Sequence, residues 1–104
     1  MPGALEGFRI VDLTQGLCGP FASMRLGDAG AEIIKIEPLT GETSRTMGPP
    51  FIGDESAVFL SLNRNKKSVA VDLATAEGQE LVRKLIAQAD VILEDLGPGK
   101  AEEI

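Results

Sequence analysis

Two short apolar segments rich in β-branched residues, 8–13 and 31–37, lie on either side of a segment with helical character. Apolar runs of this length and composition are typical of strands buried in a parallel sheet. Pro20 suits the first turn of the intervening helix, and Gly30 suits the left-handed residue that follows a helix. This order predicts a right-handed strand–helix–strand unit and therefore an α/β fold.

The second half of the chain repeats this alternation after a long loop. Residues 38–56 hold three prolines and three glycines and predict a loop, and 57–62 could form a short helix. A third strand is expected at 68–73 and a fourth at 91–93, with a helix between them that Thr75 is placed to cap. The prediction is a doubly wound parallel sheet with the spatial strand order 3-2-1-4.

The predicted topology indicates where a ligand would bind. The chain reverses direction between strands 1 and 4 of such a sheet, and ligands bind there, beyond the carboxyl ends of the strands. The loops at that point, 14–20 and 95–99, both carry glycine. They are therefore the first place to expect a binding site.

The composition restricts the chemistry that such a site can perform. A chain of 104 residues, one small domain at most, has no histidine and one cysteine. Within this chain, that excludes Ser–His and Cys–His catalysis, histidine-ligated metals and an intrachain disulfide. A formal net charge of −6 and few aromatic residues disfavour nucleic-acid binding. No segment approaches the roughly 20 apolar residues of a membrane span, so we expect a cytoplasmic protein without a membrane partner.

The turn Gly16–Gly19 has two interpretations. It could bring backbone amides close to a nucleotide at a helix start, or it could be only a tight strand-to-helix turn. Glu37 ends the second strand, about where a dinucleotide-binding fold places its ribose-binding acid, although the glycine spacing is not G-x-G-x-x-G. Cys18 has no histidine to act as its base, so we expect a packing role for it.

Two charged clusters are also ambiguous. Arg64, Lys66 and Lys67 could contact a phosphate, but a solvated turn is the favoured interpretation. The acidic pairs 94–95 and 102–103 could perform acid–base chemistry or bind a metal. Acids at a sheet edge and a helix start are more often simply solvated, which we favour here.

Several segments resemble the start of a family III CoA-transferase. They are residues 5–14, 19–20, 30–38, 48–51, 59–69, 72–73, 89–94 and 98–99. The asparagine- and lysine-rich stretch 63–67 is the most specific of them. The resemblance extends from Leu5 to the last residue of the chain.

The resemblance implies a Rossmann-like N-terminal region that binds CoA thioesters, with 1–104 as the truncated N-terminal part of a larger domain. Members move CoA between carboxylic acids through an aspartyl intermediate. A related branch contains α-methylacyl-CoA racemases, and a portion of such a racemase-like enzyme is the alternative that the resemblance leaves open. CoA and acyl-CoA are substrates, and no prosthetic group is implied. The aspartate nucleophile lies beyond the Pro-Gly turn, so this chain should hold no catalytic residue and be inactive alone. Members are interlocked homodimers.

The resemblance also assigns CoA contacts residue by residue. They map to Gly16, Leu17, Cys18, Pro38, Val71, Asp72, Leu73, Ala74, Asp95, Leu96 and Gly97. Basic residues of the family are replaced at Pro38, Ala74 and Glu103, which weakens phosphate binding. Four other basic residues could compensate, namely Arg45, Arg64, Lys66 and Lys67.

Two alternatives to an enzyme portion stay open at this point. One is a non-catalytic module that binds a nucleotide or a protein partner. The other is a dinucleotide-binding domain that uses Glu37 on a ribose.

Overall fold

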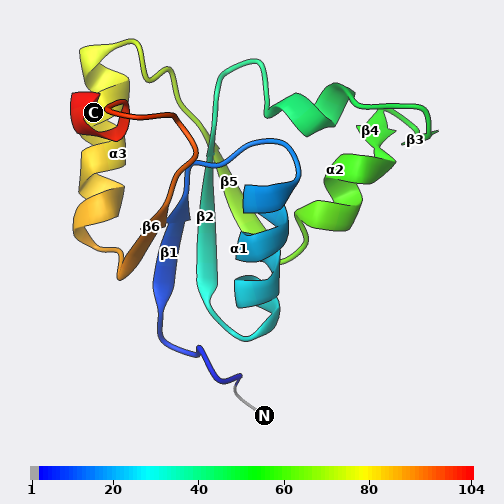
Figure 1. Cartoon of the computed structure of the whole chain (residues 1–104), viewed down its shortest axis with the longest axis horizontal. Helices are drawn as coiled ribbons and strands as arrows, with labels where there is room; N and C mark the ends of the chain where they lie inside the picture. Colours follow the sequence, from blue (N-terminus) through cyan, green and yellow to red (C-terminus); the bar gives the residue numbers. More distant parts are fainter. Residues whose placement is uncertain (1–2) are drawn as a thin grey trace.

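A four-stranded parallel sheet forms the centre of the computed structural model, which describes residues 3–104 (Figure 1). Its strands are β1 (Arg9–Asp12), β2 (Glu32–Glu37), β5 (Lys66–Ala70) and β6 (Val91–Leu93). They lie in the order β5-β2-β1-β6, and every neighbouring pair is parallel. The α/β class and the strand order 3-2-1-4 are therefore confirmed.

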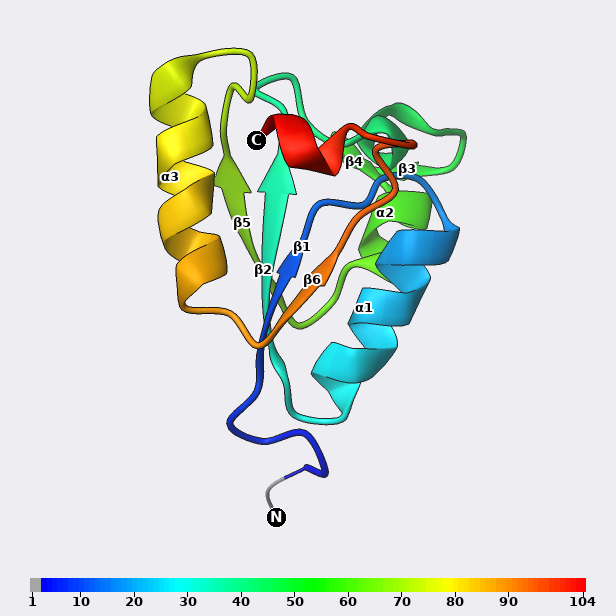
Figure 2. The ribbon, with the colours of Figure 1, turned by 60° about the vertical axis from the view of Figure 1, so that its left-hand side comes forward.

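Helices cover both faces of this sheet. Figure 2 shows α3 (Ala76–Ala87) on one side, and α1 (Cys18–Asp28) and α2 (Ala57–Leu62) on the other. The remaining elements are two 3-10 helices, η1 (Thr43–Thr46) and η2 (Ala101–Glu103), and a hairpin of β3 (Phe51–Ile52) and β4 (Glu55–Ser56). Among residues 3–104, no helix has the length and apolar character needed to cross a membrane.

The turn between β1 and α1 depends on close packing. A Cβ atom on Gly19 would lie 2.3 Å from the Cβ of Thr14, so only glycine fits there. The helix starts two residues before Pro20, whose missing N–H costs nothing because N–H groups in the first turn have no helical partner. Gly30 follows the helix with φ of +109°, as the sequence predicted.

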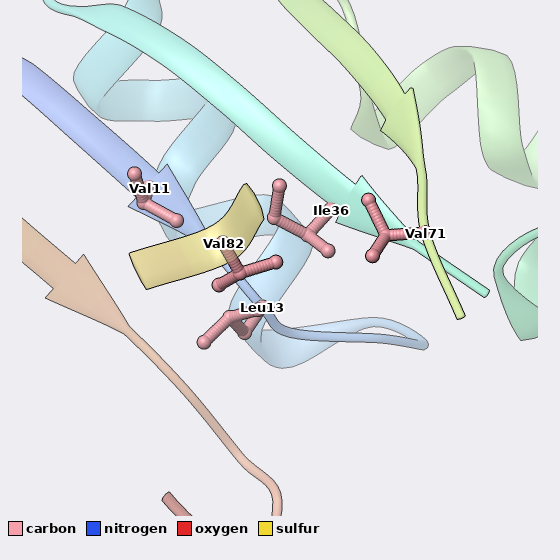
Figure 3. Close-up of a cluster of buried hydrophobic side chains, with 5 residues drawn as sticks. All are labelled: Val11, Leu13, Ile36, Val71 and Val82. Carbon is pink, nitrogen blue, oxygen red and sulfur yellow. The ribbon is translucent and has the colours of Figure 1, made fainter. Parts of the chain in front are cut away.

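The face of the sheet toward α3 carries the main apolar core. Alternate residues of the parallel strands point to this side, as the period of two requires. Val11, Leu13, Ile36 and Val71 pack there against Val82 of α3, and all five are buried (Figure 3). Val82 is fully buried, which makes it the centre of the helix–sheet contact.

The opposite face, toward α1, is apolar only near the amino ends of the strands. Ile10 and Ile33 are buried there, with Leu26 of α1 packed against them. Closer to the carboxyl ends, the buried side chains on this face are charged or polar, including Asp12 and Lys35. The two faces of one sheet therefore differ in chemistry.

Two expectations about this part of the fold were wrong in detail. The third strand, β5, begins at Lys66 rather than at residue 68, because Lys66 pairs in register with Ile33. Segment 38–56 is not an irregular loop, since it contains η1 and the β3–β4 hairpin. The short helix at 57–62 and the capping role of Thr75, whose Oγ1 accepts from the Gly78 N–H at 3.0 Å, are confirmed.

Candidate functional site

The carboxyl ends of the strands surround a cavity of about 330 Å³ on the α3 side of the sheet. Its apolar walls are Leu13, Ile36, Val71, Leu73 and Leu96. This volume lies at the lower end of the range of about 300–1,000 Å³ for small-molecule sites. A larger ligand would therefore place only one portion in the cavity.

The rim of the cavity is more polar than its walls. The rim residues are Gln15, Glu37, Pro38, Leu39, Thr40 and Asp72. They come from the ends of three strands, so the cavity occupies the carboxyl edge where parallel sheets bind ligands. The rim offers carboxylate, amide and hydroxyl groups and no basic side chain.

The structure brings some of the predicted site residues together and leaves others outside the cavity. Pro38, Val71, Asp72, Leu73 and Leu96 line it. The others are not part of its lining, and they are Gly16, Leu17, Cys18, Ala74, Asp95 and Gly97.

Of the predicted residues outside the lining, Asp95 forms a hydrogen bond to a residue that lines the cavity. Its Oδ2 accepts a hydrogen bond from the backbone N–H of Gln15 at 3.2 Å, so it connects the loops after β1 and β6. Leu17, the N-cap of α1, and Cys18, its first residue, are exposed. The packing role expected for Cys18 is therefore wrong, because α1 packs through later residues such as Ser23 and Met24.

Six lining residues are not among the eleven CoA contacts assigned from the family resemblance, although Gln15 lies in the predicted ligand loop 14–20 and Glu37 was considered for a ribose. The six are Leu13, Gln15, Ile36, Glu37, Leu39 and Thr40. Two signals could have found them. Leu13 and Ile36 end apolar strands at the predicted ligand edge, and Gln15 adjoins a predicted glycine turn. Leu39 and Thr40 carry no such signal, because the course of their loop depends on distant ion pairs.

The four basic residues expected to compensate for missing phosphate contacts are all paired with acids. The pairs are Arg45–Glu37 at 2.6 Å, Arg64–Asp28 at 2.6 Å, Lys66–Asp12 at 3.2 Å and Lys67–Glu32 at 3.0 Å. Lys66 is also buried in β5, so the expected solvated turn is wrong for this residue. None of the four lines the cavity.

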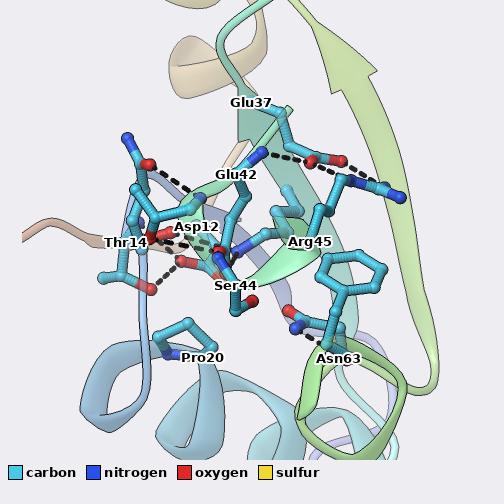
Figure 4. Close-up of polar contacts among 12 residues, drawn as sticks. Asp12, Thr14, Pro20, Glu37, Glu42, Ser44, Arg45 and Asn63 are labelled. Atoms are coloured by element: carbon cyan, nitrogen blue, oxygen red, sulfur yellow. Dashed lines mark hydrogen bonds and ion pairs between the residues drawn. The ribbon is translucent and has the colours of Figure 1, made fainter. Parts of the chain in front are cut away.

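Asp12 is the centre of a buried polar network on the α1 face (Figure 4). Its carboxylate accepts from the Thr14 N–H at 2.8 Å, the Ser23 hydroxyl at 2.5 Å and Lys66 Nζ at 3.2 Å. Burial raises the pKa of Asp12, but hydrogen bonds from Ser23 and Thr14 and the charge of Lys35 outweigh it and lower the pKa overall. Burial lowers the pKa of Lys66, and Asp12 opposes that effect.

A second buried pair joins β2 to η1. Lys35 Nζ lies 3.3 Å from Glu42 Oε1, both side chains are almost fully buried, and Lys35 also donates to the Thr14 carbonyl at 3.1 Å. Burial raises the pKa of Glu42, but hydrogen bonds from Ser44 and the charge of Lys35 produce a net lowering. Glu42 is therefore held ionised against the sheet.

Glu37, the last residue of β2, has a fully used carboxylate. Oε1 accepts from the Glu42 N–H at 2.9 Å and Arg45 Nε at 2.6 Å, and Oε2 accepts from Arg45 Nη2 at 2.8 Å and the Ser68 hydroxyl. A carboxylate offers about four lone-pair sites, so none remains for a ribose hydroxyl. The ribose-binding role considered for Glu37 is therefore wrong.

These bonds also determine how Glu37 titrates. Burial raises the pKa of Glu37, but the hydrogen bonds from Arg45, Ser68 and the Glu42 N–H lower it overall to about 2. The same interaction with Glu37 raises the pKa of Arg45 above its ordinary value. Both groups are therefore charged across the physiological range.

The acids near the end of the chain do not form a catalytic or metal cluster. Glu94 Oε2 accepts from the Leu96 N–H at 2.9 Å, and the acids at 102–103 lie exposed in η2. Within residues 3–104, no group of three or more potential ligands could hold a metal ion. The favoured interpretation of these acids as solvated surface residues agrees with their positions.

Comparisons with known proteins agree with the fold. The human succinyl-CoA:glutarate CoA-transferase is 54% identical over 97 residues, which are 92% of this chain and 22% of the relative. The succinyl-CoA:mesaconate CoA-transferase of Haloarcula hispanica is 42% identical over 106 residues, covering 97% of this chain and 26% of the relative. The crystal structure of a CAIB/BAIF family protein from Brucella suis matches with a TM-score of 0.94 and 40% identity, covering 99% of this chain and 28% of that one.

The chain thus spans about a quarter of the length of the relatives it matches. The family model of CoA-transferase family III matches residues 5–104, which is nearly the whole chain. The chain therefore belongs to CoA-transferase family III.

Proposed function

We propose that this chain is the CoA-binding, N-terminal part of an enzyme that transfers CoA between carboxylic acids through an aspartyl intermediate. The observation that carries the proposal is a ligand-sized cavity at the carboxyl edge of a sheet that matches CoA-transferase family III over residues 5–104. The aspartate nucleophile that the family resemblance implies lies outside these 104 residues. The chain alone then binds CoA without turning it over.

The cavity best suits the nucleobase end of CoA. Its walls are aliphatic, and the carboxylate of Asp72 on the rim can accept from an exocyclic amino group. The rim holds the carboxylate of Asp72 and no basic side chain, so the phosphates of CoA would lie outside the cavity. The CoA-contacting role of the eleven residues carried over from the family is part of this proposal, and five of them line the cavity.

The acids that exchange CoA are proposed to be dicarboxylates. This extension is supported by two relatives whose names specify succinyl-CoA with glutarate or mesaconate as the second acid. An interlocked homodimer in the cytoplasm remains our expectation for the whole enzyme, from the family resemblance and the absence of a membrane signal in the sequence.

Titration calorimetry of the chain with CoA and with NAD tests the binding proposal. We expect heat of binding with CoA and none with NAD; tight NAD binding without CoA binding would overturn the CoA-binding proposal. Leu39→Glu places a charge on the exposed part of the rim and should weaken CoA binding. Leu60→Glu is the matched control, because Leu60 is an exposed leucine of α2 outside the cavity.

A steady-state assay tests the missing nucleophile. The purified 104-residue chain should transfer no CoA from succinyl-CoA to glutarate. Robust transfer by this chain alone would show that its catalytic group lies within these residues and would overturn that part of the proposal.

A further inference from the structure

One part of the rim of the cavity, segment 38–40, which we call the wall 38–40, is not held in place by its own burial. Leu39 is 68% exposed, and Thr40 is also exposed. The segment forms a turn that closes through the Gly41 N–H donating to the Pro38 carbonyl at 2.8 Å. A turn of this kind defines a local shape, but it does not determine how the wall is oriented relative to the sheet.

The orientation of this wall is determined by Glu37, which directly precedes it. The Glu37 carboxylate binds the Glu42 N–H at 2.9 Å and the Arg45 guanidinium at 2.6 and 2.8 Å. The chain therefore leaves β2 at Glu37 and is bound back to the same side chain at residues 42 and 45. Segment 38–41 is constrained as the short loop between these attachments.

The guanidinium of Arg45 also makes a contact on the side that faces away from Glu37. This guanidinium lies 3.9 Å from the ring centroid of Phe59 in α2, a cation–π contact. The planar guanidinium contacts the carboxylate through two nitrogens, which sets its direction as well as its distance. A lysine at this position would keep the charge and lose the direction.

The chain that follows the wall 38–40 also contacts the opposite side of the cavity, through η1. The Thr43 N–H donates to Gln15 Oε1 at 3.2 Å, and the backbone of Gln15 is held by Asp95 at 3.2 Å. Gln15 is a rim residue that comes from a different loop. The position of η1 therefore determines two parts of the rim together.

We propose that Glu37 and Arg45 are positioning residues for the CoA site, which act by orienting the wall 38–40 and do not contact CoA through their charged groups. This inference rests on the proposed CoA-binding function. The charged groups face the α1 side of the sheet, whereas the cavity lies on the α3 side. Their influence on CoA must therefore pass through the backbone of the wall.

The first test compares two glutamates of β2. Glu37→Gln and Arg45→Lys should each weaken CoA binding at least tenfold in calorimetry. Glu32→Gln is the matched control, because Glu32 starts the same strand, pairs with Arg9 at 2.5 Å and lies outside the cavity. It should change CoA affinity less than twofold, and an equal loss in Glu32→Gln and Glu37→Gln would overturn the proposal.

A double-mutant cycle distinguishes positioning from a general loss of stability. Leu39→Ala shortens the wall directly, so combining it with Arg45→Lys should weaken CoA binding by much less than the product of the two single effects. If the affinity loss of the double variant instead equals the product of the two single losses, Arg45 does not act through the wall and the proposal is overturned. If Glu37→Gln does not fold, Ser68→Ala removes only one of the four donors and should weaken CoA binding a few-fold.

Hydrogen exchange provides a readout that does not need CoA. The backbone amides of Gly41 and Glu42 should exchange at least tenfold faster in Glu37→Gln than in the wild type and be unchanged in Glu32→Gln. Unchanged exchange in Glu37→Gln would overturn the positioning role. Failure of the wild-type chain to bind CoA, with exchange altered as expected, would instead reject the proposed function and retain the orientation of the wall by Glu37.

Discussion

The two faces of the central sheet are stabilised in different ways. Toward α3, aliphatic side chains of alternate strand positions pack on the apolar stripe of one helix. Toward α1, the sheet buries the side chains of Asp12, Lys35 and Glu37 near its carboxyl edge. It also buries the side chain of Lys66 at the start of β5. An apolar contact tolerates any partner of suitable shape, whereas each buried charge needs one particular partner.

The need of each buried charge for one particular partner explains how segment 38–47 is held at one position on the sheet. Replacing a buried ion pair by apolar residues is often neutral, but removing one partner from it is strongly destabilising. The charged face therefore contributes specificity of position more than net stability. The α3 face contributes most of the hydrophobic free energy, because burial of apolar area scales with the area removed from water.

The largest effect should come from Asp12→Ala on the charged face. The change leaves Lys66 buried without a counter-charge and removes the acceptor used by Ser23 and Thr14. We expect a loss of about 4 kcal/mol in the free energy of unfolding. Urea denaturation measures it, and a loss below 1 kcal/mol would mean that the network relaxes or admits water.

Val82→Ala should have a smaller effect on the apolar face. Val82 is fully buried against the sheet, and removing two methyl groups loses transfer free energy and leaves a small cavity. We expect a loss of about 2 kcal/mol, measured in the same urea experiment. A loss that exceeds that of Asp12→Ala would reverse the comparison between the faces.

Acid should destabilise the charged face selectively. The pKa of Glu37 is about 2 in the folded chain and near 4.5 when unperturbed, so the unfolded state takes up the proton first as the pH falls. The contribution of Glu37 is therefore complete above about pH 5 and is lost as the pH approaches 2. Unfolding free energies at pH 7, 4 and 3 should fall less steeply in Glu37→Gln than in the wild type, and parallel curves would contradict this assignment.

The smallest effect is expected at an exposed ion pair of α3. Arg83 and Glu80 approach to 3.8 Å, with more than half of each side chain exposed. Arg83→Ala should change the free energy of unfolding by less than about 0.5 kcal/mol, because solvent screens such pairs. Thermal denaturation of this variant and of Asp12→Ala measures both losses of stability. The comparison shows whether burial of an ion pair, rather than ion pairing itself, accounts for the difference between them.

The same contrast explains what the sequence could predict. The α3 face follows from local periodicity, since alternating residues such as Val69 and Val71 and the helical stripe around Val82 reveal which side is buried. The fold class and the strand order followed from these patterns. The start of β5 did not follow from these patterns, because Lys66 resembles a solvated residue until its partner Asp12 is known.

The cavity was predictable as a location but not as a set of side chains. Topology placed it at the carboxyl edge of the sheet, in loops that include Leu96, and the family resemblance added Val71 to the prediction. Leu39 and Thr40 were missed because their loop is oriented by Glu37 and Arg45. That pair forms only after β2 and η1 meet, and no local sequence pattern encodes it.

The parallel sheet has a further consequence for how the chain reaches its fold. β1 lies in the interior of the sheet, but its partner β6 pairs Val91 with Ile10, at the opposite end of the sequence. At ribosomal rates of about 5–20 residues per second, roughly 4–16 seconds separate the synthesis of these two strands. During that interval β1 lacks one neighbour, so a nascent chain is most open to mispairing or chaperone capture along this strand.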